Sequence, residues 1–256
     1  MKNHRTISAQ ELLFSQGFGS RHECTGAILA GHLRFNQQIV TDPFLDLEVF
    51  EGAPYAVVDK PWAFYTRAYL VLHKPAGYEC STKPKHHPSA YSLLPTPLRV
   101  RDVQAVGRLD EDTTGLLLFS DDGQFIHRVT SPKHKAAKIY RTTLKHPGTA
   151  QQIEALMKGV VLNDSPKPVA ALGARLIDEL TLELTLSEGK YHQVKRMLAA
   201  VGNRVEALHR SAIGTHQLRA DCAEGQWYWL SDEELAQIGW GAKPLIDAAA
   251  VKPSST

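Results

Sequence analysis

The residues best suited to chemistry lie in the stretch GRLDEDTTGLLLFS at positions 107–120, where three successive carboxylates stand directly before an apolar run. A carboxylate at a strand end beside apolar walls is partly desolvated, and desolvation raises its pKa unless a nearby cation stabilises the anion. A carboxylate kept ionised in this way can act as a nucleophile or base on a bound substrate. Arg108 and Asp110 share one face of an extended chain with Val106, so Asp110 is the first candidate for this role.

Two other interpretations of the acidic stretch remain open on pattern alone. It can be a simple turn between two strands, with side chains bonded to their own backbone. It can also be a calcium loop, because Asp110, Asp112, Thr114 and Gly115 fall on positions 1, 3, 5 and 6 of an EF-hand loop, with Asp121 at position 12. The calcium pattern is incomplete, since position 12 should be a glutamate and helices should flank the loop.

The cation that would pair with the catalytic carboxylate is expected in the segment SEGKYHQVKRMLAAVGNRVEALHR. This segment predicts a short helix on which Tyr191 and Lys195 share a face, as do His192 and Arg196. A basic surface helix with its apolar residues packed inward explains most of the same pattern, so only one or two of the polar residues need be functional.

A second basic segment, HRVTSPKHKAAKIYRTTLKH at 127–146, contains lysines and arginines and no acid. Such a run can be a solvated face, but it can also neutralise nucleic-acid phosphates. Tyr140 lies within the run, two residues after Lys138, and is either a core residue or a platform against a base.

The composition allows one large domain or a small domain and a larger one. The chain has 256 residues and a net charge of +2 with histidine neutral, which permits a polyanionic partner without requiring one. Its three cysteines are far apart and form no CxxC pair, which favours a reducing compartment. No apolar run approaches the roughly 18 residues of a membrane span, and His86–His87 has no third ligand in view. We therefore expect a soluble, cytoplasmic protein without a metal site.

Residues 1–50 predict a small helix–helix–hairpin domain. Ser8 and Ser20 begin two capping boxes, each with a glutamate three residues later. The stretch LRFNQQIV, with alternating apolar positions around Asn36, predicts the hairpin. Residues 51–67 are rich in proline and aromatic side chains and are interpreted as a linker.

The remaining chain, residues 68–240, predicts an α+β domain with a largely antiparallel sheet. A helix is expected after Thr149, ending at Gly159, and another over YHQVKRMLAAV. Residues 241–256 are expected to form a flexible tail. The candidate strands are AYLVLHKP, AVGRL, GLLLFS, KIYRTTLKH, ARLI and LTLELTLSEG.

Several of these segments together resemble the RNA pseudouridine synthases. GRLDEDTTGLLLFSDDG resembles that family's signature, KIY at 138–140 resembles its Lys-x-Tyr motif, and EGKYHQVKRMLAAVGNRVEALHR resembles the third motif of the RsuA-type branch. HKPAGYECST and HPSAYSLLP are similar to the opening of that branch's catalytic domain. The resemblance spans roughly residues 68–230 with its motifs in the right order. The N-terminal unit resembles an S4-type RNA-binding domain, although TISAQELL stands in place of its usual basic opening.

The resemblance implies a fold, an activity and a set of site residues. The fold would be a mixed, mostly antiparallel sheet with a central cleft, and no cofactor or metal would be needed. Asp110 would be the catalytic aspartate, Tyr140 would stack on a flipped-out uracil, and Lys195 would pair with Asp110. The expected substrate-binding residues are Arg108, Leu208, Lys138, Arg196 and His192.

The expected reaction is isomerisation of a uridine to pseudouridine in ribosomal RNA, most simply that of the small subunit. The alternatives that remain open are a pseudouridine synthase acting on large-subunit rRNA and a non-catalytic RNA-binding or ribosome-assembly protein. The default oligomeric state is a monomer, and no membrane or metal partner is expected.

Overall fold

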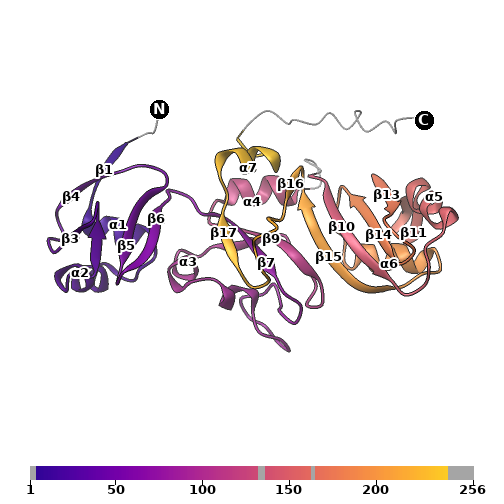
Figure 1. Ribbon diagram of the computed structural model, residues 1–256, viewed down its shortest axis with the longest axis horizontal. Coiled ribbons are helices and arrows are strands. Elements are labelled where there is room, and N and C mark those ends of the chain that lie inside the picture. Colours follow the sequence, from indigo (N-terminus) through magenta and orange to yellow (C-terminus); the bar gives the residue numbers. More distant parts are fainter. Residues whose placement is uncertain (1–3, 132–135, 163–164, 242–256) are drawn as a thin grey trace. The chain divides into compact units, whose positions relative to one another are not determined.

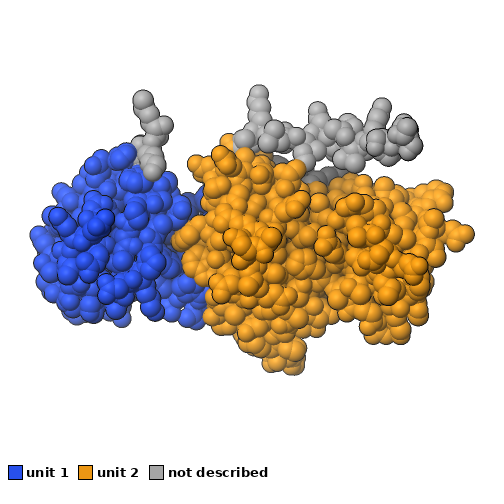
Figure 2. All heavy atoms as spheres, viewed as in Figure 1, with its two compact units in different colours: residues 1–69, 94–104, 120–122 blue, residues 70–93, 105–119, 123–256 orange. Residues whose placement is uncertain are grey.

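The computed structural model describes residues 4–131, 136–162 and 165–241 (Figure 1). The predicted tail at 241–256 therefore lies, apart from Gly241, outside the described residues. The chain divides into two compact units, coloured separately in Figure 2. The first unit comprises residues 1–69, 94–104 and 120–122, and the second comprises residues 70–93, 105–119 and 123–256.

The N-terminal part of the first unit confirms the predicted helix–helix–hairpin order. Ser20 forms a reciprocal capping box with Glu23, and the Ser8 hydroxyl accepts from the backbone N–H of Glu11. Asn36 and Gln37 have positive φ angles of 47° and 65°, the conformation that a tight two-residue hairpin requires. The elements are β1 (Arg5–Ser8), α1 (Ala9–Ser15), α2 (Arg21–Leu29), β2 (Leu33–Phe35), β3 (Gln38–Val40) and β4 (Asp46–Val49).

The interpretation of residues 51–67 as a linker is wrong. They form β5 (Ala53–Val57) and β6 (Lys60–Phe64), which extend the hairpin into a four-stranded sheet ordered β3-β2-β5-β6. Tyr55 and Phe64 are buried in the core of this unit. The prolines obscured the strand pattern, but Pro61 lies on the edge strand β6, and Pro54 precedes the residues of β5 that pair with β2. Neither proline therefore needs to donate to a strand on both sides.

The second unit contains a mixed, mostly antiparallel sheet, as predicted. In the described part of the chain it has nine strands, with the main path β13-β14-β10-β15-β9-β7-β17, and β9 pairs with β15 in parallel. Five of the six predicted strand segments are confirmed, whereas the sixth, AVGRL at 105–109, is a strand only at Ala105 and Val106. The strands are β7 (Tyr69–Lys74), β8 (Gln104–Val106), β9 (Thr114–Ser120), β10 (Lys138–Leu144), β13 (Gly173–Leu176), β14 (Thr181–Leu186), β15 (Val205–Ile213), β16 (His216–Gln217) and β17 (Trp227–Trp229).

Helices and short strands complete the two units. Thr149 caps α5 through a reciprocal bond with Gln152, as expected, and Gly159 ends that helix. No helix in the described part of the chain is long and apolar enough to span a membrane. The remaining elements are a 3₁₀ turn (Ala90–Leu93), α3 (Thr96–Val100), α4 (Gly123–Thr130), α5 (Ala150–Lys158), β11 (Val160–Leu162), β12 (Ser165–Val169), α6 (Gln193–Ala200) and α7 (Asp232–Gln237).

The parallel contact of β9 with β15 positions the start of β9 beside the middle of β15. His209 pairs with Thr114, and Arg210 pairs with Gly115. Gly115 has φ +107°, and a Cβ at this position would collide with the Arg210 backbone. A glycine is therefore needed for the two backbones to approach, and the loop that precedes β9 is brought next to β15.

Candidate active site

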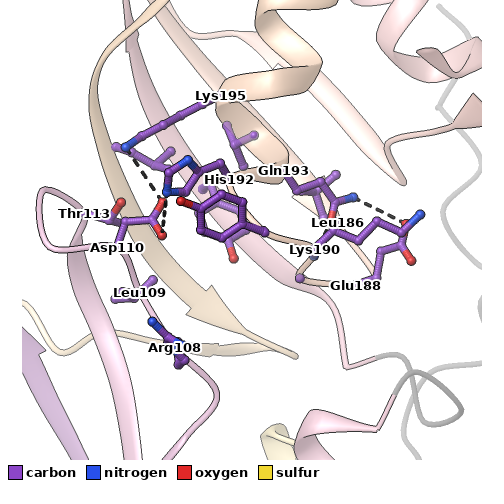
Figure 3. Close-up of a pocket in the computed structure, with 15 residues that line it drawn as sticks. Arg108, Leu109, Asp110, Thr113, Leu186, Glu188, Lys190, His192, Gln193 and Lys195 are labelled. Carbon is purple, nitrogen blue, oxygen red and sulfur yellow. Dashed lines mark hydrogen bonds and ion pairs between the residues drawn. The ribbon is translucent and has the colours of Figure 1, made fainter. Parts of the chain in front are cut away.

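A cavity of about 260 Å³ opens over the middle of the second unit's sheet. It is lined by the loop before β9, by side chains of β10, β14 and β15, and by the segment entering α6 (Figure 3). The lining residues are Arg108, Leu109, Asp110, Thr113, Tyr140, Leu186, Glu188, Gly189, Lys190, Tyr191, His192, Gln193, Val194, Lys195 and Leu208. Six of the eight predicted site residues are thus brought together around one cavity.

Asp110 lies in the loop between β8 and β9 and points toward His192 and Lys195 in Figure 3. Its side chain is 26% exposed, so it is neither sealed in the core nor free in solvent. The neighbouring Leu109 is buried, and the Thr113 N–H donates to the Asp110 carbonyl, which closes a turn. The turn interpretation of the acidic stretch is therefore correct for the backbone, while the Asp110 side chain faces the cavity.

A buried lysine holds the loop before β9 through hydrogen bonds to its carbonyls. Lys74 is fully buried at the end of β7, and its ammonium donates to the carbonyls of Pro75, Glu111 and Thr113 at 3.0, 3.1 and 2.9 Å. Burial lowers the pKa of Lys74 below its usual range. Lys74 was not among the predicted site residues, although a lysine within the apolar stretch AYLVLHKP was the available signal.

Lys195 contacts two carboxylates rather than one. Its Nζ donates to both oxygens of Asp112 at 2.7 Å and lies 3.8 Å from Oδ2 of Asp110. Partial burial acts to raise the pKa of Asp112, but the hydrogen bond and charge of Lys195 outweigh it, so the pKa of Asp112 is lowered. The predicted lysine is therefore close to Asp110, but its direct hydrogen bonds go to Asp112, which the sequence analysis did not assign to the site.

His192 is the second basic neighbour of Asp110. Its Nε2 lies 3.4 Å from Oδ1 of Asp110. His192 precedes the first turn of α6 with φ 49°, a left-handed conformation that few non-glycine residues adopt. This backbone turn directs the imidazole toward the loop before β9, and it also brings the His192 ring against that of Tyr191, with centroids 3.7 Å apart.

The walls of the cavity are aromatic and apolar. Tyr140 on β10 and Leu208 on β15 are each 7% exposed. In the β10–β15 ladder Tyr140 opposes Arg210 and Thr142 opposes Leu208, so the tyrosine and leucine side chains share one face of the sheet. Leu186 of β14 adds a further apolar contact surface. The site therefore combines the Asp110 carboxylate, which lies between the His192 and Lys195 side chains, with an aromatic ring and aliphatic walls.

Two predicted substrate-binding residues do not line the cavity. The Arg196 guanidinium donates to the Tyr191 carbonyl at 3.2 Å. The Lys138 ammonium donates to the Ala136 carbonyl at 3.1 Å. Burial, reinforced by the charge of Arg210, lowers the pKa of Lys138 to about 8. Lys133 and Lys135 of the same basic segment lie outside the described residues.

The calcium interpretation is wrong. Asp110 and Asp121 are separated by the whole of β9, and the residues after the acidic stretch form that strand rather than a helix. Among the residues with described positions, no group of three or more histidine, cysteine, aspartate or glutamate side chains is arranged to hold a metal ion.

The fold and the site define a class of enzyme in which a loop aspartate faces a base-sized cavity in a mixed sheet. The sequence profile described as RNA pseudouridylate synthase matches residues 68–200, and the chain belongs to this family. A crystal structure described as that of a pseudouridylate synthase covers 91% of this chain and 99% of its own, with a TM-score of 0.64 and 34% identity.

Curated relatives give a finer comparison. The ribosomal small subunit pseudouridine synthase A of Yersinia pestis is 46% identical over 190 residues, covering 74% of this chain and 78% of the relative. The enzyme of the same name from Escherichia coli K12 is 43% identical over 189 residues, covering 74% and 79%. This chain is accordingly an RNA pseudouridine synthase.

Proposed function

We propose that the enzyme isomerises a specific uridine of small-subunit ribosomal RNA to pseudouridine in the cytoplasm, with Asp110 as the catalytic carboxylate. One observation carries the proposal: the Asp110 side chain faces a cavity with a tyrosine and leucine wall, and His192 and Lys195 lie within 3.4 and 3.8 Å of its two oxygens. The name shared by the relatives supports the choice of the small-subunit RNA.

The reaction rearranges bonds within one nucleotide. The N1–C1′ bond breaks, the uracil turns in place, C5 bonds to C1′, and the proton on C5 is released while N1 gains one, so the atoms balance without a cofactor. Asp110 would initiate cleavage by attack on the sugar or base or by removal of a ribose proton. Either route needs the carboxylate to face the substrate directly, as Asp110 faces the cavity.

The cavity suits a reaction with a detached intermediate. Free uracil must stay in place while it turns, so the site must be close-fitting and shielded from water. Tyr140 and Leu208 would hold the base between flat and aliphatic surfaces. The target uridine must first leave its stack, which costs a few kcal/mol, and contacts to phosphates must supply that energy.

The RNA contacts are proposed to come from two regions. The basic segment around Lys138 and the helix carrying Lys195 and Arg196 would contact phosphates near the target. The N-terminal unit, with its S4-like helix–helix–hairpin order, would bind a second part of the RNA. The enzyme is proposed to act as a monomer.

The proposal is tested by tritium release from 5-tritiated uridine in small-subunit and large-subunit rRNA, followed by mapping of the modified position. We expect release from the small-subunit RNA, and none with Asp110→Asn, which should still bind RNA because it keeps the shape of the side chain. Release only from large-subunit RNA would refute the substrate. Binding without release from either RNA would indicate a non-catalytic RNA-binding protein, and an active Asp110→Asn enzyme would remove Asp110 from the catalytic role.

A further inference from the structure

Tyr191 is an exposed aromatic residue at the rim of the cavity. The residue is 74% exposed, although it is also one of those that line the cavity. Large aromatic side chains usually bury much of their surface, because their transfer out of water is favourable. One face of the Tyr191 ring is covered by His192, and the high exposure leaves much of the rest to solvent.

The ring of Tyr191 has a defined stacking partner. It stacks on His192 with an interplanar angle of 20°. The His192 imidazole is in turn next to Asp110, and the Tyr191 carbonyl accepts a hydrogen bond from Arg196. The left-handed backbone at His192 (φ 49°) accompanies this stacking of two consecutive side chains. A flat aromatic surface therefore lies against the histidine that contacts the catalytic carboxylate.

The size of the cavity determines which nucleotides of the RNA the Tyr191 ring can contact. A volume of about 260 Å³ lies below the roughly 300–1,000 Å³ of pockets that enclose drug-sized ligands. The cavity therefore has room for one flipped nucleotide and not for its neighbours in the chain. The nucleotides that flank the target must lie outside the cavity, within reach of its rim.

We propose that Tyr191 is a stacking platform for a base next to the target uridine, and that it holds the RNA at the rim while the uridine occupies the cavity. This inference rests on the proposed function, since it requires an RNA substrate. Aromatic side chains bind unstacked bases through their faces with little dependence on sequence. Tyr140, which is almost fully buried, would contact the target base, so the two tyrosines would have separate roles.

The test asks whether removing the Tyr191 ring and removing the base that it is proposed to contact have the same, non-additive effect on binding. The full-length wild type, Tyr191→Ala and Tyr191→Phe are compared on an rRNA fragment around the uridine that the wild type modifies, and on matched fragments with an abasic site on its 5′ or 3′ side. An abasic site several nucleotides away is the RNA control. The dissociation constant and the single-turnover rate are measured for each protein with each RNA fragment.

Tyr191→Ala is expected to weaken binding roughly 5- to 150-fold, while Tyr191→Phe binds as the wild type does. For one of the two fragments with a neighbouring abasic site, the wild type should bind more weakly than it binds the intact fragment, by a similar factor. Tyr191→Ala should bind that abasic fragment about as well as it binds the intact one. With the distal abasic site, the ratio of the dissociation constants of Tyr191→Ala and the wild type should be the same as with the intact fragment.

Independent losses from the substitution and from both neighbouring abasic sites would overturn the proposal, as would full affinity of Tyr191→Ala for the intact fragment. A fall in rate with unchanged affinity would make Tyr191 a support for His192 instead, and would also overturn it. A wild type that forms no pseudouridine in any rRNA would refute the proposed function and this inference together, whereas missing coupling with an active wild type refutes only the role of Tyr191.

Discussion

At the scale of single residues, the site depends on three neighbouring charged side chains, those of Asp112, Lys195 and Asp110. Lys195 is shared between Asp112, which it contacts at 2.7 Å, and Asp110 at 3.8 Å. Asp112 thereby fixes the lysine, and the lysine presents its charge to Asp110 without occupying that carboxylate through a direct hydrogen bond. Such an arrangement places a positive charge beside Asp110 and leaves its oxygens accessible to a substrate.

The first prediction concerns this pair. Lys195→Met should lower kcat on the order of 100-fold, because it removes a preorganised charge beside the reacting group. The RNA dissociation constant should change little. Single-turnover rates and filter-binding constants separate the two effects. Equal losses of rate and affinity would identify Lys195 as a phosphate contact instead.

The second prediction concerns Lys138, whose pKa is lowered to about 8 by burial and by Arg210. The unfolded chain then binds more protons than the folded one between about pH 8 and the ordinary lysine pKa of 10.5. Stability from this group therefore rises with pH across that window. Lys138→Met should raise the Tm at pH 7 and raise it less at pH 10.5.

Lys158 provides a matched control for this measurement. It is an exposed lysine paired with Glu154 on α5, so Lys158→Met should change the Tm little at either pH. An equal change for Lys138→Met at both pH values would show that loss of its charge is not the cause.

At the scale of elements, the parallel contact between β9 and β15 joins the aspartate loop to the wall that carries Leu208. Gly115 is the point of closest approach, because its positive φ and the adjacent Arg210 backbone leave no room for a side chain. Lys74 then fixes the loop by bonding two of its carbonyls. The distance from Asp110 to the cavity wall is thus determined by backbone contacts.

The third prediction follows from that contact. Gly115→Ala should reduce the free energy of unfolding by about 3 kcal/mol or more, since strain in φ adds to a backbone collision. Gly202→Ala is the matched control, because Gly202 has φ +75° with nothing within 4 Å of the added Cβ. It should lose only about 1–2 kcal/mol, the cost of the left-handed conformation. Urea denaturation measures both, and equal losses would contradict the collision.

At the scale of the whole molecule, the N-terminal unit includes two segments from the middle of the chain. Arg101 joins them within that unit. Its guanidinium donates to Asp121 at 2.6 and 3.0 Å and to Gln16 and the Tyr65 carbonyl at 2.9 and 3.1 Å. The Arg101 and Asp121 side chains are only 4% and 13% exposed. The pair therefore holds together parts of the unit that are distant in sequence.

The fourth prediction is that Arg101→Met destabilises this unit by roughly 3 kcal/mol, because it leaves a nearly buried carboxylate without its counter-charge. Arg99→Met is the control, since Arg99 is exposed and donates a local hydrogen bond to Thr96. Denaturation followed by tryptophan fluorescence should show an early transition for Arg101→Met alone. A single unshifted transition would mean that the pair contributes no net stability.

Local sequence determined much of this protein. The capping residues Ser20 and Thr149, the hairpin at Asn36 and five of the six strand segments follow from patterns among near neighbours, and the structure agrees with each. Residues 51–67 are the exception, because whether a proline-containing stretch pairs as a strand depends on a partner elsewhere in the chain.

The sequence also predicted that Asp110 and Lys195 lie close together, and the resemblance added Tyr140, Leu208 and, as a substrate-binding residue, His192. Only the tertiary structure decided that Lys195 bonds Asp112, that Lys74 supports the loop and that Tyr191 stacks at the rim. A difference of about 1 Å separates the two possible partners of Lys195. Such distances are set by the β9–β15 backbone contact and by the left-handed turn at His192, which join segments far apart in the chain and leave no local pattern.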